Sequence, residues 1–196
     1  QLQQRLEALL GRPGAIVVID VPTGELLASV SLPTYDLNRY GDLYFELTSD
    51  RVDLPLWNRC VAMRYPPGST FKPLAAMAGL SEGVISPSTT FNCRGYLHSP
   101  SAFRCWIWKY HRGHGRLNVV EALEHSCNVY FYTVGEKLGL SRLNGFLGQL
   151  RMDRTPGTGL PEETAGLLPD PHQTQGPGEA RFLAIGQGKV EVTPMH

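Results

Sequence analysis

The chain has 196 residues, which is enough for one good-sized hydrophobic core or two small ones, and 42% of them are hydrophobic, as in a globular protein. Lys and Arg together number 18, as do Asp and Glu, so the formal net charge is zero. This balance excludes the basic excess of a general nucleic-acid binder and the polybasic attraction to an anionic membrane. The sequence contains no apolar run of 18 residues and no signal peptide, which leaves a cytosolic protein or a piece of a longer exported one.

The first predicted elements are a helix and a β-hairpin. Leucines at helical spacing predict a helix that ends at Gly11 and Pro13. The apolar run over residues 15–20 predicts a buried strand, and a turn over residues 22–24 leads to a second strand over residues 25–31. This order of elements predicts an α+β domain.

A long loop and an Ala-rich helix are predicted next. Residues 32–58 contain turn-forming residues throughout, which favours a surface loop. The stretch YPPGSTFKP over residues 65–73 then predicts an extended approach to a helix that closes near Gly83. In this register Ser69 is the N-cap, and Pro73 lies in the first turn, where a missing N–H is tolerated.

The following elements alternate between loops and helices. Residues 84–117 are aromatic and rich in turn formers, without clear periodicity. Asn118 and Glu121 resemble a capping box at the start of a helix, and a second helix over residues 128–138 should end at Gly139.

The last part of the chain, residues 151–180, holds many Gly and Pro and is predicted to be a loop. A short extended run over residues 189–192 follows, and Thr193 with Pro194 has the pattern of a helix start.

Ser69 and Lys72 form an S-x-x-K motif. Residues i and i+3 share one helical face, so the lysine amine can reach the serine hydroxyl and act as its base. A lysine can accept a proton only if burial or nearby positive charge lowers its pKa. The alternative is an ordinary helix start with an exposed lysine.

Ser126 and Asn128 form an S-x-N motif between two predicted helices, 54 residues after Lys72. The serine could relay a proton between the lysine and a leaving amine, and the asparagine could position the lysine and the substrate. The alternative is that Ser126 only caps the helix that starts near Asn128.

S-x-x-K followed by S-x-N is part of the signature of β-lactamases and penicillin-binding proteins. The chain resembles class B penicillin-binding proteins along nearly its whole length, and in particular the penicillin-binding protein 2 group, which makes side-wall peptidoglycan in rod-shaped bacteria. The landmarks that carry this resemblance are YPPGSTFKP, SCNVYFY, TGLPEE (158–163), GLLP (166–169), IGQG-x-x-x-VTP (185–194) and, for the subgroup, FNC…CW…HG (91–115).

The resemblance implies an α+β fold of the penicillin-binding transpeptidase and serine β-lactamase type, an antiparallel sheet flanked by helices, here without its C-terminal strands. Residues 1–196 would be a partial transpeptidase domain. It would consist of a helix and β-hairpin over residues 1–31, a helical subdomain with both motifs over residues 59–150, and a loop-rich segment over residues 151–196.

The activity implied by the resemblance is peptidoglycan D,D-transpeptidation. Ser69 would be the nucleophile, Lys72 the general base, Ser126 the proton relay and Asn128 the residue that positions lysine and substrate. A β-lactam would acylate Ser69 in place of the D-Ala-D-Ala stem peptide. No metal or cofactor is required by this chemistry.

The sequence departs from the family pattern in one respect, since it contains no K-[ST]-G motif. Thr158-Gly159 follows a glycine, and Lys189 is followed by valine. We expect a truncated domain, inactive by itself, rather than a degenerate enzyme. The alternatives are a serine β-lactamase or β-lactam sensor on the same fold, and a non-catalytic scaffold relative that lost the motif.

The resemblance also implies partners and a location. The expected partners are stem peptides, β-lactams, the glycosyltransferase of the elongation complex and its periplasmic scaffold protein, with no nucleic acid. The expected location is the periplasmic face of the inner membrane, reached through an N-terminal anchor that the sequence lacks.

Cys93, Cys105, His111 and His114 have a spacing compatible with a structural zinc site. The alternatives are a Cys93–Cys105 disulfide, which a periplasm would allow, or free buried cysteines with solvated histidines. Cys127, within S-x-N, is expected to be a small buried filler. The nearby aromatic residues are expected to pack the loop against the body of the protein; they are Trp106, Trp108 and Tyr110.

Overall fold

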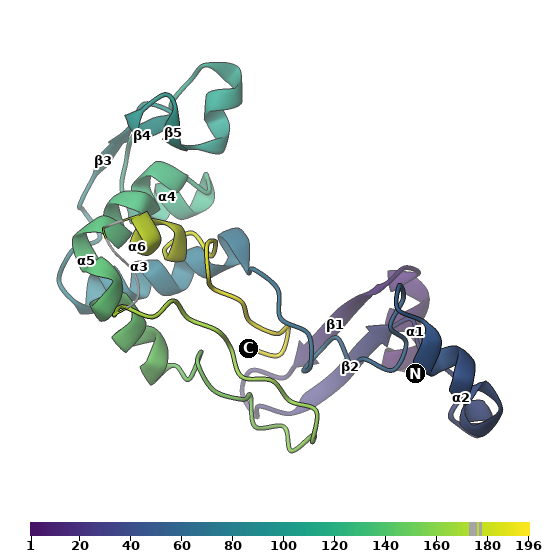
Figure 1. Ribbon diagram of the computed structural model, residues 1–196. Helices are drawn as coiled ribbons and strands as arrows, with labels where there is room; N and C mark the ends of the chain where they lie inside the picture. Colours follow the sequence, from purple (N-terminus) through teal and green to yellow (C-terminus); the bar gives the residue numbers. More distant parts are fainter. Residues whose placement is uncertain (173–175, 177) are drawn as a thin grey trace. The chain divides into compact units, whose positions relative to one another are not determined.

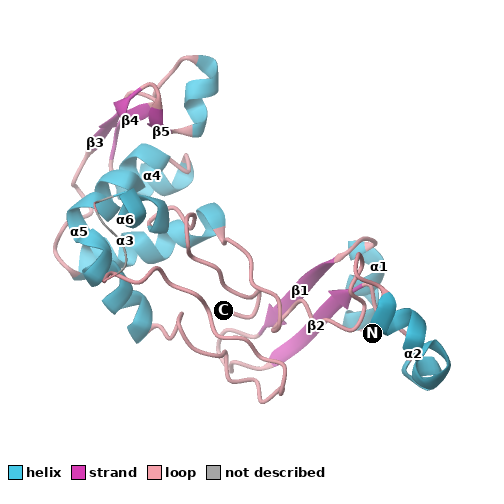
Figure 2. Cartoon of the chain, in the orientation of Figure 1, coloured by secondary structure: helices cyan, strands magenta, loops and turns pink. Residues whose placement is uncertain are grey.

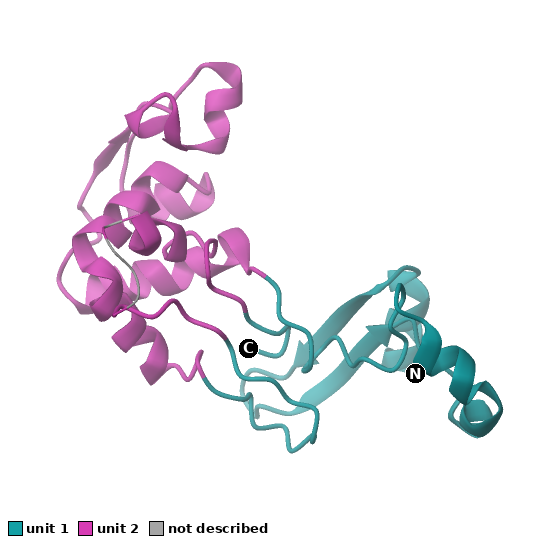
Figure 3. Cartoon of the chain, viewed as in Figure 1, with its two compact units in different colours: residues 1–65, 154–166, 192–196 teal, residues 66–153, 167–191 magenta. Residues whose placement is uncertain are grey.

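The computed structural model describes residues 1–172, 176 and 178–196. The chain forms two compact units (Figure 3). Unit 1 contains residues 1–65, 154–166 and 192–196, and unit 2 contains residues 66–153 and 167–191. Each unit is therefore built from segments that are far apart in the sequence.

Unit 1 begins with the predicted helix and hairpin (Figure 1). Helix α1 (Leu2–Leu10) ends at Gly11, whose φ of 56° is the left-handed conformation that glycine adopts without strain. Strands β1 (Gly14–Ile19) and β2 (Leu26–Leu32) pair antiparallel, with Ile16 opposite Val30. These elements confirm the sequence prediction.

The side chain of Gln3 joins α1 to the hairpin. Its Nε2 donates to the backbone oxygen of Ser29 at 2.8 Å, and the Ser29 N–H donates to its Oε1 at 3.1 Å. One glutamine therefore satisfies both backbone groups of a strand residue.

The predicted loop over residues 32–58 is wrong in its middle, where a short 3₁₀ turn, η1 (Leu37–Arg39), leads into helix α2 (Tyr40–Ser49). Leu47 is the one buried residue of α2, whereas Phe45 is 82% exposed. Because the aromatic side chains of this helix face outward, its sequence lacks the apolar stripe by which a helix is recognised.

Unit 2 is mainly helical (Figure 2). Its helices are α3 (Lys72–Ser81), α4 (Val119–Glu124), α5 (Asn128–Gln149) and α6 (Gly178–Leu183). The core residues come mostly from α3 and α5, around fully buried Phe131 and Val134. No helix among the described residues is both long enough and apolar enough to cross a membrane.

Glycines set the path and packing of α5. Gly139 has φ 72° and ψ 163°, so the helix is kinked where the sequence predicted its end, and a second, unpredicted helical part follows at once. A Cβ atom added at Gly135 would lie 2.3 Å from the Ala180 backbone oxygen. The close contact between α5 and α6 therefore requires a glycine at that position.

The segment over residues 84–117 contains short strands that the sequence did not predict. Strand β3 (Phe91–Cys93) pairs with β6 (Gly115–Leu117), β4 (Tyr96–Ser99) pairs with β5 (Ala102–Arg104), and the 3₁₀ turn η3 (Trp106–Tyr110) lies between them in sequence. Strands of three or four residues are too short to show the alternation that reveals a strand.

The prediction that a helix starts at Thr193 is not tested by the four residues from Thr193 to His196. Residues 193–196 form a turn in which the Thr193 hydroxyl lies 2.8 Å from His196 Nδ1. The His196 N–H also donates to the Thr193 backbone oxygen at 3.1 Å, a bond that an isolated turn and the first turn of a helix have in common.

Candidate active site

Ser69 lies in a 3₁₀ turn, η2 (Gly68–Phe71), and not at the N-cap of an α-helix as predicted. Helix α3 begins at Lys72, and Pro73 lies in its first turn. Gly68 has a φ of 60°, which turns the chain sharply before the serine and leaves Ser69 exposed. The tighter 3₁₀ turn places Ser69 and Lys72 one above the other, because residues i and i+3 eclipse in this geometry.

Ser126 and Asn128 lie at the junction between α4 and α5. Helix α4 has the capping box that the sequence predicted at Asn118 and Glu121. Ser126 has a φ of 48°, an unusual conformation for a residue other than glycine. Its side chain does not cap α5, whose N-cap is Cys127 without a side-chain bond. The interpretation of Ser126 as a simple helix cap is therefore wrong.

The four predicted side chains meet around Lys72 Nζ. This nitrogen lies 3.1 Å from Ser69 Oγ and 2.9 Å from Ser126 Oγ. It also lies 2.8 Å from the Ser126 backbone oxygen and 2.7 Å from Asn128 Oδ1. The Ser126 hydroxyl donates to Ser69 Oγ at 3.0 Å, so the two serines and the lysine form a closed triangle.

The lysine is buried although the serine is exposed. Lys72 is 1% exposed, and burial lowers its pKa from the ordinary value to about 8, while the Coulomb interactions with Cys105 and Cys127 act in the opposite direction. Its Nζ also lies 5.9 Å from the centre of the Phe131 ring. The interpretation of Lys72 as an exposed lysine is therefore wrong, and a substantial fraction of it is neutral near pH 8.

Lys72 Nζ donates to all four oxygens around it, whereas a neutral amine would have only two N–H groups and one lone pair. The Ser126 backbone oxygen and Asn128 Oδ1 can only accept hydrogen bonds, so they take both N–H groups of the neutral amine. The protonated amine donates to Ser69 Oγ at 3.1 Å, and loss of that proton leaves a lone pair that can accept the proton of the Ser69 hydroxyl. The arrangement can activate a serine nucleophile.

A second group of reactive side chains lies next to this one, and its donor atoms all lie within 4.8 Å of one another. His114 Nδ1 lies 3.6 Å from the sulfurs of both Cys93 and Cys105. A tetrahedral zinc site, with bonds of about 2.3 Å to sulfur and 2.0 Å to nitrogen, separates a sulfur and a nitrogen ligand by about 3.5 Å. The residues of this cysteine cluster are Cys93, Cys105, His114 and Cys127.

The cluster corrects the predicted zinc set at one position. Cys127 belongs to it, whereas His111 lies at the end of η3 with its ring 5.7 Å from that of Trp108. The fourth side chain of the cluster therefore comes from the S-x-N motif, which sequence spacing could not indicate. All four cysteines of the chain are free thiols, so the Cys93–Cys105 disulfide is absent.

Backbone N–H groups and thiols stabilise negative charge on the cluster. The Asn128 N–H donates to Cys105 Sγ at 3.3 Å, and the Gly95 N–H donates to Cys93 Sγ at 3.4 Å. Hydrogen bonds from the Cys127 and Cys93 thiols lower the pKa of Cys105, and the same bonds raise the pKa of their donors. These bonds favour the thiolate form at Cys105, and the thiolate is the form that binds a metal ion.

Gly186 supports the nucleophile turn, a contact that sequence reasoning missed. The Gly68 N–H donates to the Gly186 backbone oxygen at 2.8 Å. A Cβ atom at Gly186 would lie 2.2 Å from the Gly68 oxygen. The paired glycines of the IGQG landmark were the available signal, since glycine is required where two backbones approach closely.

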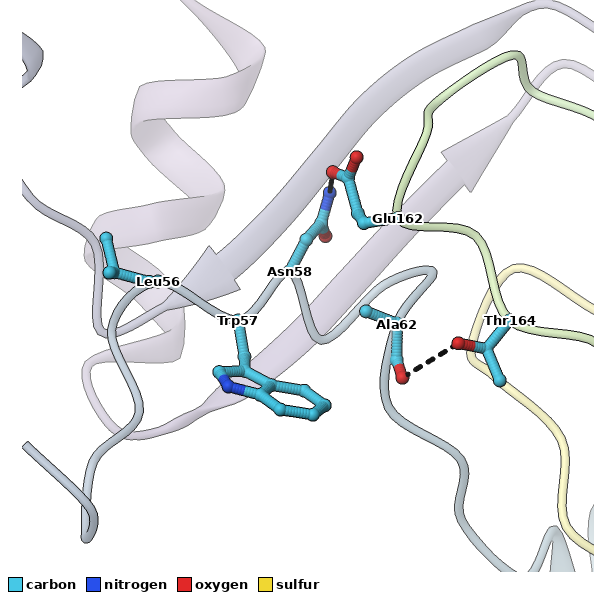
Figure 4. A pocket seen from close by; sticks show the side chains of 6 residues that line it. All are labelled: Leu56, Trp57, Asn58, Ala62, Glu162 and Thr164. Atoms are coloured by element: carbon cyan, nitrogen blue, oxygen red, sulfur yellow. Dashed lines mark hydrogen bonds between the residues drawn. The ribbon is translucent and has the colours of Figure 1, made fainter. Parts of the chain in front are cut away.

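Unit 1 contains a hollow of about 550 Å³ (Figure 4). Within it Asn58 Nδ2 donates to Glu162 Oε1, and the Thr164 hydroxyl donates to the Ala62 backbone oxygen. Its polar groups bind one another, and the hollow includes no member of the Lys72 group. We assign no chemistry to it.

The chain matches the family described as penicillin binding protein transpeptidase domain over residues 14–196. It is 38% identical to the peptidoglycan D,D-transpeptidase MrdA of Acinetobacter baumannii over 96% of its own length. It spans about a third of the length of the curated relatives it matches, 30% of this one and 33% of the Escherichia coli protein of the same name.

Solved structures give the same result. A complex of penicillin-binding protein PBP2 with MreC from Helicobacter pylori matches 99% of the chain with a TM-score of 0.89 and 32% identity, and the match covers 38% of that protein. A peptidoglycan synthase complex that coordinates polymerization and crosslinking matches 99% of the chain with a TM-score of 0.82 and 35% identity, covering 35% of its own chain.

Proposed function

Because the chain belongs to the penicillin-binding protein transpeptidase family, we propose that it forms the nucleophile-bearing part of a peptidoglycan D,D-transpeptidase. The observation that carries this proposal is the contact of Lys72 Nζ with both serine hydroxyls and with Asn128 Oδ1. In this geometry the proposed nucleophile, Ser69, and the proposed proton relay, Ser126, both lie within 3.1 Å of the proposed base, Lys72 Nζ.

The reaction begins with acylation of the serine. Ser69 Oγ attacks the carbonyl carbon of the penultimate D-alanine, while its proton passes to the lone pair of Lys72 Nζ. A tetrahedral oxyanion forms, and the family uses the backbone N–H of the nucleophile, here Ser69, as one of its hydrogen-bond donors. This step requires the neutral form of Lys72.

Collapse of the intermediate breaks the C–N bond. Ser126 Oγ, which contacts both Lys72 Nζ and Ser69 Oγ, passes a proton from the lysine to the leaving nitrogen, and the terminal D-alanine departs as an amine. An amine from a neighbouring stem peptide then attacks the ester carbonyl, and Ser69 recovers its proton. A β-lactam follows the first half of this path and leaves Ser69 acylated.

The proposed partners follow from the two solved assemblies. The MreC complex supports a periplasmic scaffold protein as partner, and the synthase complex supports a glycosyltransferase that makes the glycan strand. The substrates and the MrdA relatives support the periplasmic face of the inner membrane as the location. The proposed N-terminal anchor would provide the attachment to that membrane.

The proposal is tested by mass spectrometry of the complete protein after incubation with penicillin. We expect one penicilloyl adduct on the peptide that contains Ser69, and none in the Ser69→Ala variant. An adduct on another residue, or an unreactive wild type, would overturn the assignment and favour a non-catalytic scaffold. Rapid turnover of a chromogenic cephalosporin would instead favour a β-lactamase.

We also propose that the cysteine cluster holds a structural zinc ion. The specific observation is the convergence of three sulfurs and one imidazole nitrogen within 4.8 Å, a soft donor set that favours zinc. All three cysteines are buried, as in a closed structural site without a position for substrate. Metal analysis of the purified protein should find one zinc ion per chain.

A further inference from the structure

The segment Arg104–Trp106 contacts the S-x-N motif on both of its sides. This segment runs from the end of β5 into η3, about 20 residues before the motif in sequence. Its three contacts are Trp106 Nε1 to the His125 backbone oxygen at 3.0 Å, the Asn128 N–H to Cys105 Sγ at 3.3 Å, and Asn128 Nδ2 to the Arg104 backbone oxygen at 3.4 Å.

The motif requires such support because Ser126 has an unfavourable backbone conformation. With a φ of 48°, its oxygen and its hydroxyl both face Lys72, at 2.8 and 2.9 Å from Nζ. A residue other than glycine keeps this conformation only where the surroundings hold it. Relaxation of the peptide before Ser126 would remove both contacts with the lysine at once.

The Trp106 indole holds that peptide directly. Its N–H donates to the carbonyl of His125, the residue before Ser126. Trp106 is 45% exposed, so its ring is not required to fill the core. The ring also packs edge-on against His114, with ring centres 5.3 Å apart, so a test of the hydrogen bond must keep this packing intact.

The Arg104 oxygen fixes the orientation of the Asn128 amide. The amide nitrogen faces this oxygen, and Oδ1 consequently faces Lys72 Nζ at 2.7 Å. Rotation of the amide by 180° would direct an N–H₂ group at the lysine and break both bonds. The segment thus selects the orientation in which asparagine accepts a hydrogen bond from the base.

Cys105 joins this segment to the cysteine cluster. Its sulfur accepts the Asn128 N–H and is also one of the four converging donor atoms. The cluster therefore anchors the segment at a point that also fixes Asn128.

We infer that Arg104–Trp106 is a positioning segment for acylation, in which the Trp106 indole N–H and the Cys105 sulfur hold Ser126 and Asn128 against Lys72. This inference rests on the proposed transpeptidase function, because its readout is acylation of Ser69. Trp106 is a positioning residue that does not itself contact the reacting atoms.

The test compares Trp106→Phe with Trp108→Phe in the complete protein. Trp108 lies in the same turn and packs edge-on against Tyr96, with ring centres 5.1 Å apart. Binding of a labelled penicillin and the subsequent acylation rate constant are measured separately by stopped flow. We expect Trp106→Phe to lower the acylation rate constant by roughly tenfold, as for one lost hydrogen bond, with little change in binding. Trp108→Phe should leave the acylation rate constant within about twofold of wild type.

If Trp106→Phe does not fold, a second replacement at the same position still tests the inference. Benzothienylalanine at position 106 keeps the size of the indole and replaces its N–H by sulfur, and it should reproduce the slower acylation. Equal acylation rates for wild type and both replacements at position 106 would overturn the inference and leave the transpeptidase proposal intact. A wild type that penicillin does not acylate would overturn both.

Discussion

The Lys72 group, which consists of Ser69, Lys72, Ser126 and Asn128, lies next to the cysteine cluster in unit 2. The two regions have opposite environments. The first group ends at an exposed hydroxyl, Ser69, and the second is closed, with three buried cysteines. Both use the same tripeptide, because Ser126 and Asn128 face the lysine while Cys127 faces the other thiols. An exposed site suits exchange of substrates, whereas a closed one suits a structural ion. The comparison teaches that one short motif can serve chemistry on one side and structure on the other.

The largest expected effect is the loss of acylation on substitution of Lys72, the proposed base. Lys72→Ala should reduce the acylation rate by about 10²- to 10⁴-fold, because Ser69 loses its proton acceptor. The wild-type rate should rise with pH through about 8, since the neutral amine becomes more abundant above the lowered pKa of Lys72. Stopped-flow acylation measured across pH checks both effects. A profile unchanged by the substitution would identify a different base.

Breaking the cluster should have the next largest effect. Cys93→Ser should release the zinc ion and destabilise unit 2 by about 2–5 kcal/mol, because the buried thiolates lose their counter-ion. Cys60→Ser is the matched control, since Cys60 is fully buried in unit 1 and its thiol contacts the Val30 carbonyl. Metal analysis and thermal unfolding provide the measurement. Similar zinc content in both variants would contradict a metal site.

The smallest effect is expected behind the nucleophile turn. Gly186→Ala and Gly83→Ala both place a side chain at positive φ, 68° and 65°. At Gly83 nothing lies within 4 Å of the new methyl group, so we expect a loss of about 1 kcal/mol. At Gly186 the methyl group would meet the Gly68 oxygen, and the loss should exceed about 2 kcal/mol.

The acylation rates of the same two glycine variants provide a second comparison. Displacement of Gly68 moves the neighbouring Ser69, so Gly186→Ala should also slow acylation, while Gly83→Ala should not. Chemical unfolding together with penicillin labelling measures both quantities. Equal effects of the two substitutions would show that strain at positive φ, and not the contact with the nucleophile turn, is responsible.

The local parts of the fold could be read from the sequence. The leucine spacing and Gly11 predicted α1, the β-branched runs predicted the hairpin, and Asn118 with Glu121 predicted the start of α4. Helix α2 could not be recognised because its aromatic residues are exposed, and the strands over residues 91–117 could not because each is too short.

The candidate site divides in the same way. Sequence spacing alone brought Ser69 and Lys72 together, because i and i+3 are neighbours on any helical turn. The sequence also places Ser126 and Asn128 two residues apart, with Cys127 between them. The meeting of the two motifs, across 54 residues, needed the packing of α3 against α5. The family landmarks supplied that pairing in advance of the structure.

What the sequence determined by itself is therefore the identity and local order of the reactive side chains, because short-range geometry is set by backbone stereochemistry. The tertiary structure decided which of them share an environment. Burial of Lys72 lowers its pKa, and the fold brings Cys127, not the expected His111, into the cysteine cluster. Burial and convergence depend on contacts between segments distant in sequence, which no local pattern encodes.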